Sequence, residues 1–168
     1  IDLKAKTLEV WFSIPNLDQR GGGVMGTQGP GDFFDTIVLG ERQNRHWISG
    51  SNGFARTLDF PGSTPETAVN QPIHLAMVYL EDGTTLLYRN GVPYGKPFRR
   101  NRATFPKNQT SIIFGLRHKP AGGNKYLNVS IDKARLYNRP LNAEEVAASA
   151  SGNNLFITET DALQAMSA

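Results

Sequence analysis

The sequence predicts an all-β protein, a two-sheet antiparallel sandwich followed by one or two short helices. Three observations predict it. In several segments apolar and polar residues alternate with a period of two, as they do in a strand with one buried face. The 17 Gly and 10 Pro interrupt the chain at short intervals, which is typical of many strands joined by turns. Helical signals begin only after Tyr137, so the core is expected to consist of strands.

The middle of the chain predicts the central hairpin of the sandwich. Residues 73–80 are largely apolar on both faces of a strand, which places this strand in the middle of the domain. Asp82 and Gly83 follow, and these residue types tolerate the positive φ of a two-residue turn. Residues 84–89 are therefore expected to return as the second strand, before an Asn-Gly pair turns the chain again.

Five further strands are predicted before this hairpin. In residues 7–14, Leu8, Val10 and Phe12 stand two apart, which indicates a strand with one dry face. Gly, Pro, Asn and Ser separate the segments that follow it. Strands are expected at residues 22–28, 33–41, 45–50 and 54–60.

The segments after the hairpin complete the sheets and then become helical. Strands are expected at residues 110–116 and 126–137. Asn142 and Glu145 have the spacing of a capping box and predict a helix over residues 143–150. A second short helix is expected from Thr158 to the C-terminus.

The length of 168 residues predicts one domain. We expect the sandwich to occupy residues 1–152, and residues 153–168 to form a tail or short helix that leads to a further domain. The chain begins on a strand and not on Met, and it shows no signal-peptide pattern. It is therefore expected to be a segment cut from a longer precursor or a processed product.

Composition excludes several classes of partner and site. The net charge of +3 is too small to indicate a nucleic-acid-binding protein. No apolar run approaches the roughly 18 residues of a membrane span. The absence of Cys excludes disulfides and thiolate metal sites. We expect the isolated domain to be a monomer.

The sequence contains no pattern that indicates a nucleophilic or zinc-dependent enzyme. There is no G-x-S-x-G motif, and His46, His74 and His118 each lack a second His at short spacing. We therefore interpret the histidines as structural, with His74 expected to meet backbone or water from its central strand. No catalytic residues are predicted.

Three segments resemble the laminin-G-like, concanavalin A-like jelly-roll modules. The early strand is TLEVWFSI, the central hairpin is PIHLAMVYLEDGTTLLYRNGVPYG, and the closing segment is SIDKARLYNRPLNAEEVAA. They occur in the order and at the chain positions that these modules show, and the resemblance covers residues 3–150. It departs at Ile73, where the modules often carry Trp.

The resemblance implies a jelly roll, and usually a non-catalytic module that binds carbohydrate or protein within a large exported bacterial protein, so an extracellular or periplasmic location is expected. Such modules often hold calcium on the rim of the sandwich, which makes Asp32 and Asp35 the candidate ligands. Laminarinase-like glycoside hydrolases share the fold and use an E-x-D-x-x-E strand motif. The only near match, residues 159–164, ends in Gln and lies in an expected helix, so it is rejected as a catalytic site.

Two polar segments with an aromatic residue are the candidate binding site. Arginine forks can hold carboxylates or sulfates, and an aromatic ring can stack on a sugar. The candidate ligand-binding residues are Arg42, Trp47, Arg56, Arg117, His118 and Asn124. They are expected to converge on one surface; if they pair internally instead, they belong to the scaffold.

Residues 99–102, written RRNR, form a basic cluster in an expected loop. The cluster is interpreted as a solvated surface, with polyanion binding as the alternative. Three functions stay open at this point. They are a carbohydrate- or protein-binding module, a glycoside hydrolase, and a purely structural interdomain module.

Overall fold

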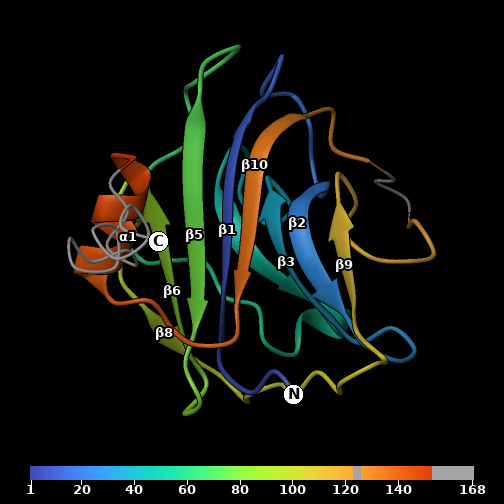
Figure 1. Cartoon of the computed structure of the whole chain (residues 1–168). Coiled ribbons are helices and arrows are strands. Elements are labelled where there is room, and N and C mark those ends of the chain that lie inside the picture. The colour runs from blue at the N-terminus through green and yellow to red at the C-terminus, as the bar shows by residue number, and fades with distance from the viewer. Residues whose placement is uncertain (123–125, 153–168) are drawn as a thin grey trace, which may run out of the picture.

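The computed structural model describes residues 1–122 and 126–152, which form a sandwich of two antiparallel sheets (Figure 1). The first sheet has the order β10-β1-β5-β6-β7, with β8 also paired to β6, and the second has the order β4-β3-β2-β9. The first sheet contains β1 (Lys6–Ser13), β5 (Ile73–Tyr79), β6 (Thr84–Arg89), β7 (Val92–Pro93), β8 (Phe98–Arg99) and β10 (Ser130–Tyr137). The second contains β2 (Gly23–Gln28), β3 (Phe34–Leu39), β4 (Trp47–Ser51) and β9 (Ser111–Phe114). The predicted all-β sandwich is confirmed.

The first strand of the chain pairs with the last one, β10. Strand β1 lies between β10 and β5, with Leu8 opposite Leu136 on one side and Met77 on the other. Its alternation places Leu8, Val10 and Phe12 in the core between the sheets, where each is fully buried. Burial of such side chains is the main favourable contribution to folding.

The predicted hairpin of β5 and β6 forms, but Leu80 N–H donates to the carbonyl oxygen of Thr84 at 2.9 Å, so the loop has three residues, 81–83, and not the predicted two. Asp82 Oδ1 accepts a hydrogen bond from the backbone N–H of Thr84 at 2.9 Å, and Gly83 has a φ of 88°. A Cβ on Gly83 would lie 1.9 Å from the carbonyl oxygen of Arg100. Only glycine therefore fits at this turn, for its backbone conformation and for its close approach to the 99–102 segment.

The helix α1 (Ala143–Ala150) covers the outer face of the first sheet beside β5 (Figure 1). Its capping box is present: Asn142 Oδ1 accepts from Glu145 N at 2.9 Å, and Glu145 Oε2 accepts from Asn142 N at 2.8 Å. Val146 packs on Ala76 and Val78, which explains why β5 is apolar on both faces. The predicted helix is confirmed. The second predicted helix, from Thr158, and the tail 153–168 lie outside the described residues.

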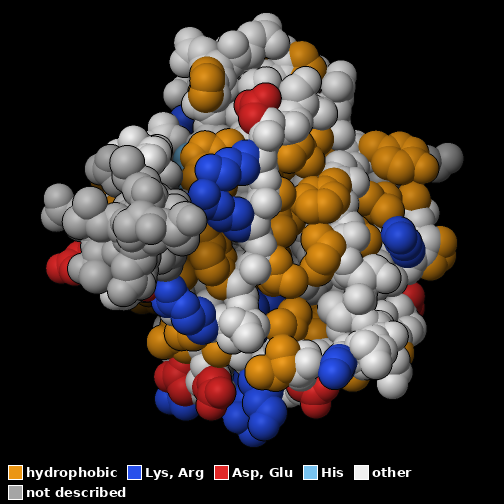
Figure 2. All heavy atoms as spheres, in the orientation of Figure 1, with side chains coloured by type: hydrophobic (Ala, Val, Ile, Leu, Met, Phe, Trp, Pro, Cys, Tyr) orange, Lys and Arg blue, Asp and Glu red, His pale blue; other side chains and the backbone are white. Residues whose placement is uncertain are grey.

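The rest of that outer face carries a polar cluster over β1 and β10. Trp11 is flanked by Lys133 Nζ at 4.8 Å and Arg135 Cζ at 5.3 Å from its ring centroid, and Figure 2 shows basic side chains over these strands. His74 is buried beside Trp11, with Nε2 3.0 Å from Glu9 Oε1. The partner of His74 is therefore a carboxylate and not backbone or water.

One predicted strand is wrong. Residues 54–60 form no strand but follow a tight 3-10 turn, η1 (Asn52–Phe54), in irregular structure. Gly53 and Phe54 have φ values of 55° and 56°, which the extended backbone of a strand excludes. No helix within residues 1–122 and 126–152 has the length and apolarity to cross a bilayer.

Candidate functional site

A cavity of about 570 Å³ lies on the outer face of the second sheet, between the turn η1 and the loop 115–122. Ile37 and Leu39 of β3 face the core, so Phe34 and Thr36 face outward. The lining of the cavity includes Asp32, Phe34, Glu41, Phe54, Arg117 and His118.

The loop on one side of the cavity is fastened to the sheet. The side chain of Gln28 donates to the carbonyl oxygen of Lys119 and accepts from its backbone N–H, both at 2.6 Å. Thr36 Oγ1 donates to the carbonyl oxygen of Arg117 at 2.7 Å. The loop is therefore held in place before any ligand arrives, which lowers the entropic cost of binding.

The turn on the other side presents an aromatic ring to solvent. Phe54 is 49% exposed and has the left-handed backbone conformation, which is an outlier for a bulky residue. Strain of this kind persists where the surrounding structure enforces it, and it concentrates at binding sites. Sequence reasoning missed Phe54 because it placed the residue in a strand, although a Gly immediately before an aromatic residue was a signal of a turn.

Arg117 and His118 both line the cavity, as the sequence predicted for one of the two segments. The guanidinium of Arg117 is paired with Glu41, and burial lowers the pKa of Arg117 from its usual value. The His118 ring stacks on Phe34 at 4.9 Å between centroids. Arg117 Nε and His118 Nδ1 are buried with no hydrogen-bond partner among the described residues. Both side chains line the cavity, but these two atoms are closed to solvent, so a ligand would reach them only after the side chains move.

Arg56 is a structural residue, which corrects its assignment to the ligand site. Its side chain is buried, and Nε lies 2.9 Å from Asp35 Oδ1. Asp35 Oδ2 lies 2.7 Å from Lys6 Nζ, so one carboxylate joins two cations between the sheets. Arg56 Nη2 also donates to Asn52 Oδ1 at 3.0 Å and to the carbonyl oxygen of Phe34 at 2.8 Å. It thereby fixes the turn and the strand that form the cavity wall.

Trp47 is also structural, and its assignment as a sugar-stacking ring is wrong. The side chain is fully buried and meets Phe12 edge-on at 5.4 Å. Its indole N–H donates to Glu66 Oε2 at 2.9 Å. Hydrogen bonds from Arg89, Trp47 and a backbone N–H outweigh burial and lower the pKa of Glu66 to about 2.

The predicted convergence of the two segments is therefore partial. Arg42 lies outside the cavity lining and pairs with Asp59 at 3.2 Å. Asn124 lies outside the described residues. Each of Arg42, Arg56 and Arg117 has its own carboxylate partner. The cavity retains Arg117 and His118 from the predicted set, and adds Phe54 and Glu41.

The two aspartates named for calcium occupy different environments. Asp32 is exposed at the cavity, whereas Asp35 is buried between Lys6 and Arg56. Within the described part of the chain, no three His, Asp or Glu side chains are grouped as a metal site. Calcium binding stays a prediction, and these two residues do not form a shared site for it.

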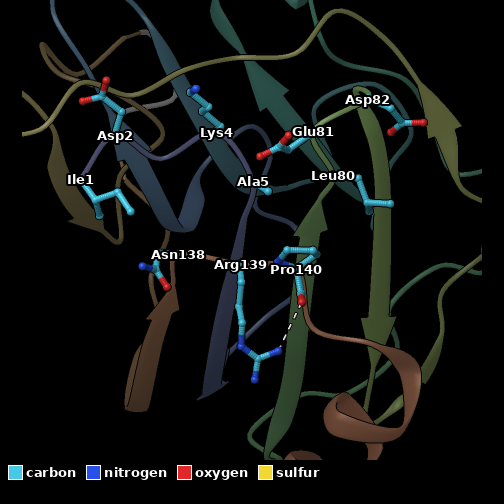
Figure 3. Close-up of a pocket in the computed structure, with 10 residues that line it drawn as sticks. All are labelled: Ile1, Asp2, Lys4, Ala5, Leu80, Glu81, Asp82, Asn138, Arg139 and Pro140. Atoms are coloured by element: carbon cyan, nitrogen blue, oxygen red, sulfur yellow. Dashed lines mark hydrogen bonds between the residues drawn. The ribbon is translucent and has the colours of Figure 1, made fainter.

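A second hollow of about 780 Å³ lies at the end of the sandwich where β1 begins and β5 and β10 end. Figure 3 shows its lining residues, with Asp2 and Lys4 on one side. Arg139 extends away from them, donates to the carbonyl oxygen of Pro140 at 3.4 Å and pairs with Glu145 at 2.8 Å. The hollow is larger than the first cavity, but no aromatic residue lines it.

Comparison with known proteins places the chain among lectin-like sandwiches. The family profile described as the concanavalin A-like lectin/glucanases superfamily matches residues 1–147. Among curated protein sequences no significant match was found. Three similar solved structures show the same fold at low sequence identity.

A protein from Bacteroides ovatus described as a putative carbohydrate binding protein has a TM-score of 0.68 and 14% identity, over 88% of this chain and 41% of its own. Domain 4 of AbnA, an extracellular arabinanase of Geobacillus stearothermophilus solved with arabinotriose, has a TM-score of 0.66 and 19% identity, over 88% and 66%. A pentraxin of Limulus polyphemus has a TM-score of 0.64 and 15% identity, over 92% and 73%. The chain thus spans about two fifths and two thirds of the first two neighbours.

Proposed function

Because the chain belongs to the concanavalin A-like lectin/glucanases superfamily, we propose that it is a non-catalytic carbohydrate-binding module with its ligand in the cavity beside Phe54. We further propose that it works as part of a larger exported bacterial protein, where polysaccharides are accessible. The carbohydrate-binding neighbours support the ligand class.

The observation that carries the proposal is the exposed, strained Phe54 at the rim of a preformed cavity. The apolar face of a sugar ring fits an exposed aromatic surface that lines a cavity. Arg117 and His118 supply polar side chains to the lining of the same cavity. An apolar surface facing a few fixed polar groups is the usual composition of a ligand pocket.

The charges of the cavity favour a neutral sugar unit. The guanidinium of Arg117 is already paired with Glu41, and Asp32 adds a further carboxylate to the lining. A uronate or sulfate placed here would meet these two carboxylates and be repelled. Hydroxyl groups can instead donate to the carboxylates and accept from Arg117 and His118. The expectation that the arginines clamp an anion in this cavity is therefore replaced by recognition of a neutral ring.

The same arrangement argues against hydrolysis. Glycoside hydrolases use two carboxyl groups with different protonation states around one glycosidic bond. Of the two acids in the cavity lining, Glu41 is engaged by Arg117. Among the described lining residues, Asp32 therefore has no second unpaired acid to act with it in hydrolysis.

Calorimetry with a panel of neutral oligosaccharides, including arabinotriose, tests the proposal. Phe54→Ala is expected to weaken binding about tenfold, since stacking on one aromatic ring contributes roughly 1–1.5 kcal/mol. Phe114→Ala is the matched control, because Phe114 is also 49% exposed but does not line the cavity. Equal losses in both variants, or no binding to any neutral sugar, would refute the proposed site.

The panel also separates the alternatives. Release of reducing sugar that is abolished by Asp32→Asn would make the protein a glycoside hydrolase. Complete absence of glycan binding would favour a structural interdomain module.

A further inference from the structure

We infer that a second cleft, adjacent to the first cavity across residues 54 and 55, binds the sulfate or carboxylate groups of an acidic polysaccharide. The cleft has a volume of about 390 Å³ and is lined by Ala55, Arg99, Arg100 and Asn101. The inference rests on the proposed function only in taking the ligand to be a polysaccharide.

The charges in this cleft are only partly neutralised by the protein. No acidic residue lines it. Arg100 lines the cleft, is exposed and has no ion-pair partner among the described residues; Arg102 is also exposed and unpaired there but lies outside the lining. Arg99 is 70% exposed, donates to the carbonyl oxygen of Asp82 at 2.8 Å and lies 3.7 Å from Asp82 Oδ2.

Most other arginines of the described chain are paired. Carboxylate partners lie within 4.0 Å of Arg42, Arg45, Arg56, Arg89, Arg117, Arg135 and Arg139. In the 99–102 segment Arg99 has a partner in Asp82 at 3.7 Å, whereas Arg100 and Arg102 have no carboxylate within 4.0 Å among the described residues. A local excess of one sign attracts ligands of the other sign.

The backbone fixes these charges in position. Phe98 and Ala103, on either side of the segment, are each 8% exposed and anchor it in the domain. Strand β8 pairs with β6, and the N–H of Arg100 donates to the carbonyl oxygen of Gly83 at 3.1 Å. The segment therefore cannot move away to relieve the repulsion among its like charges, whereas a bound anion would relieve it.

The cleft lies next to the cavity, and this position indicates what kind of polysaccharide could occupy both. Phe54 lines the cavity and Ala55 lines the cleft, and consecutive Cα atoms lie about 3.8 Å apart. A saccharide chain with a neutral ring on Phe54 can therefore place an acidic substituent, or the acidic unit next to it, in the cleft. The two hollows together fit a polysaccharide that carries both neutral and anionic groups.

The test measures binding of dextran sulfate, with unmodified dextran as the neutral polymer, at low and at physiological ionic strength. The double variant Arg99→Ser/Arg100→Ser, which removes both arginines of the cleft, is compared with Lys96→Ser/Lys107→Ser. Both remove two exposed positive charges, and neither Lys lines the cleft. Melting temperatures check that both variants stay folded.

We expect the arginine variant to lose about tenfold in dextran sulfate affinity and the lysine variant to lose less than about twofold, with weaker binding at higher salt in all proteins. Equal losses in the two variants would show a net-charge effect and overturn the inference, as would failure of the unaltered protein to bind dextran sulfate. If Phe54→Ala loses neutral sugars but keeps dextran sulfate binding, the neutral cavity and the anionic cleft work independently. If neutral sugars do not bind at all, the proposed function fails while the anionic cleft stands on the arginine result.

Discussion

The first prediction concerns the free energy that the buried carboxylate of Glu66 contributes to folding. Glu66 belongs to the loop 61–70, and its side chain is almost fully buried. One carboxylate oxygen accepts from Trp47 Nε1 at 2.9 Å and Arg89 Nε at 2.8 Å. The other accepts from Arg89 Nη2 at 2.7 Å and from the N–H groups of Thr67 and Ala68 at 2.9 Å. Glu66→Gln keeps the shape but removes the charge that all five donors share.

The magnitude follows from the pKa of Glu66, which these donors lower from 4.5 to about 2. At about 1.4 kcal/mol per pKa unit, the ionised form contributes roughly 3 kcal/mol to folding. Because the pKa is lower in the folded state, this contribution is complete above the unfolded value of 4.5 and is lost as the pH falls toward 2. Arg89 is 27% exposed, so solvent screening reduces the expected effect to about 2–3 kcal/mol.

Urea denaturation from pH 7 down to pH 3 measures the effect. Glu66→Gln is expected to lower the free energy of unfolding by about 2–3 kcal/mol at pH 7, and by progressively less as the pH falls below 4.5. Glu81→Gln, at an exposed position without an ion pair in the described chain, is the control and is expected to change stability little. A Glu66→Gln effect that is absent at pH 7, or that does not change with pH, would refute the reasoning.

Three further predictions follow from the contacts around the cavity. Asp35→Ala leaves Lys6 and Arg56 buried without their shared carboxylate, and thermal denaturation is expected to show a loss of about 3–5 kcal/mol; a loss below about 1 kcal/mol would contradict the burial of this cluster. Gln28→Ala removes both hydrogen bonds that fasten the 115–122 loop, so calorimetry is expected to show severalfold weaker glycan binding with a stability loss of only about 1–2 kcal/mol. Phe54→Gly relieves the left-handed strain, and is expected to raise stability by up to about 1 kcal/mol while abolishing the stacking contribution to binding; lower stability together with unchanged binding would remove Phe54 from the site.

The parts of the fold that local chemistry determines could be predicted from the sequence. The alternation in β1, the Asp-Gly turn after β5 and the capping box of α1 each depend on residues a few positions apart. The family resemblance, carried by three separated motifs, is confirmed by the match over residues 1–147.

The candidate site was harder because its partners are distant in sequence. Glu41 meets Arg117 across 76 positions, and no spacing rule relates them. Alternation showed that Trp47 lies on a strand but not which face is buried, so an aromatic core residue was taken for a ligand contact. Phe54 was missed for a different reason. It is an apolar residue after Gly53, and it was assigned to a strand and not to a turn.

One signal in the sequence did point to the site without being used. The run 21–23 consists of three glycines before β2. A Cβ at Gly22 would lie 2.8 Å from the backbone nitrogen of Leu127, and one at Gly23 would lie 2.8 Å from the carbonyl oxygen of Leu116. Glycines at these positions allow the backbone at Leu116 and at Leu127 to approach β2 closely, so they indicate chain folded over this sheet.

A crystal structure of the protein with the tightest-binding neutral oligosaccharide tests the central claim most directly. We predict a sugar ring stacked on Phe54, with hydroxyl groups hydrogen-bonded to Arg117 and His118 in the cavity of about 570 Å³. A ligand seated instead in the hollow beside Arg139, or on the outer face of the first sheet at Trp11, would contradict the account.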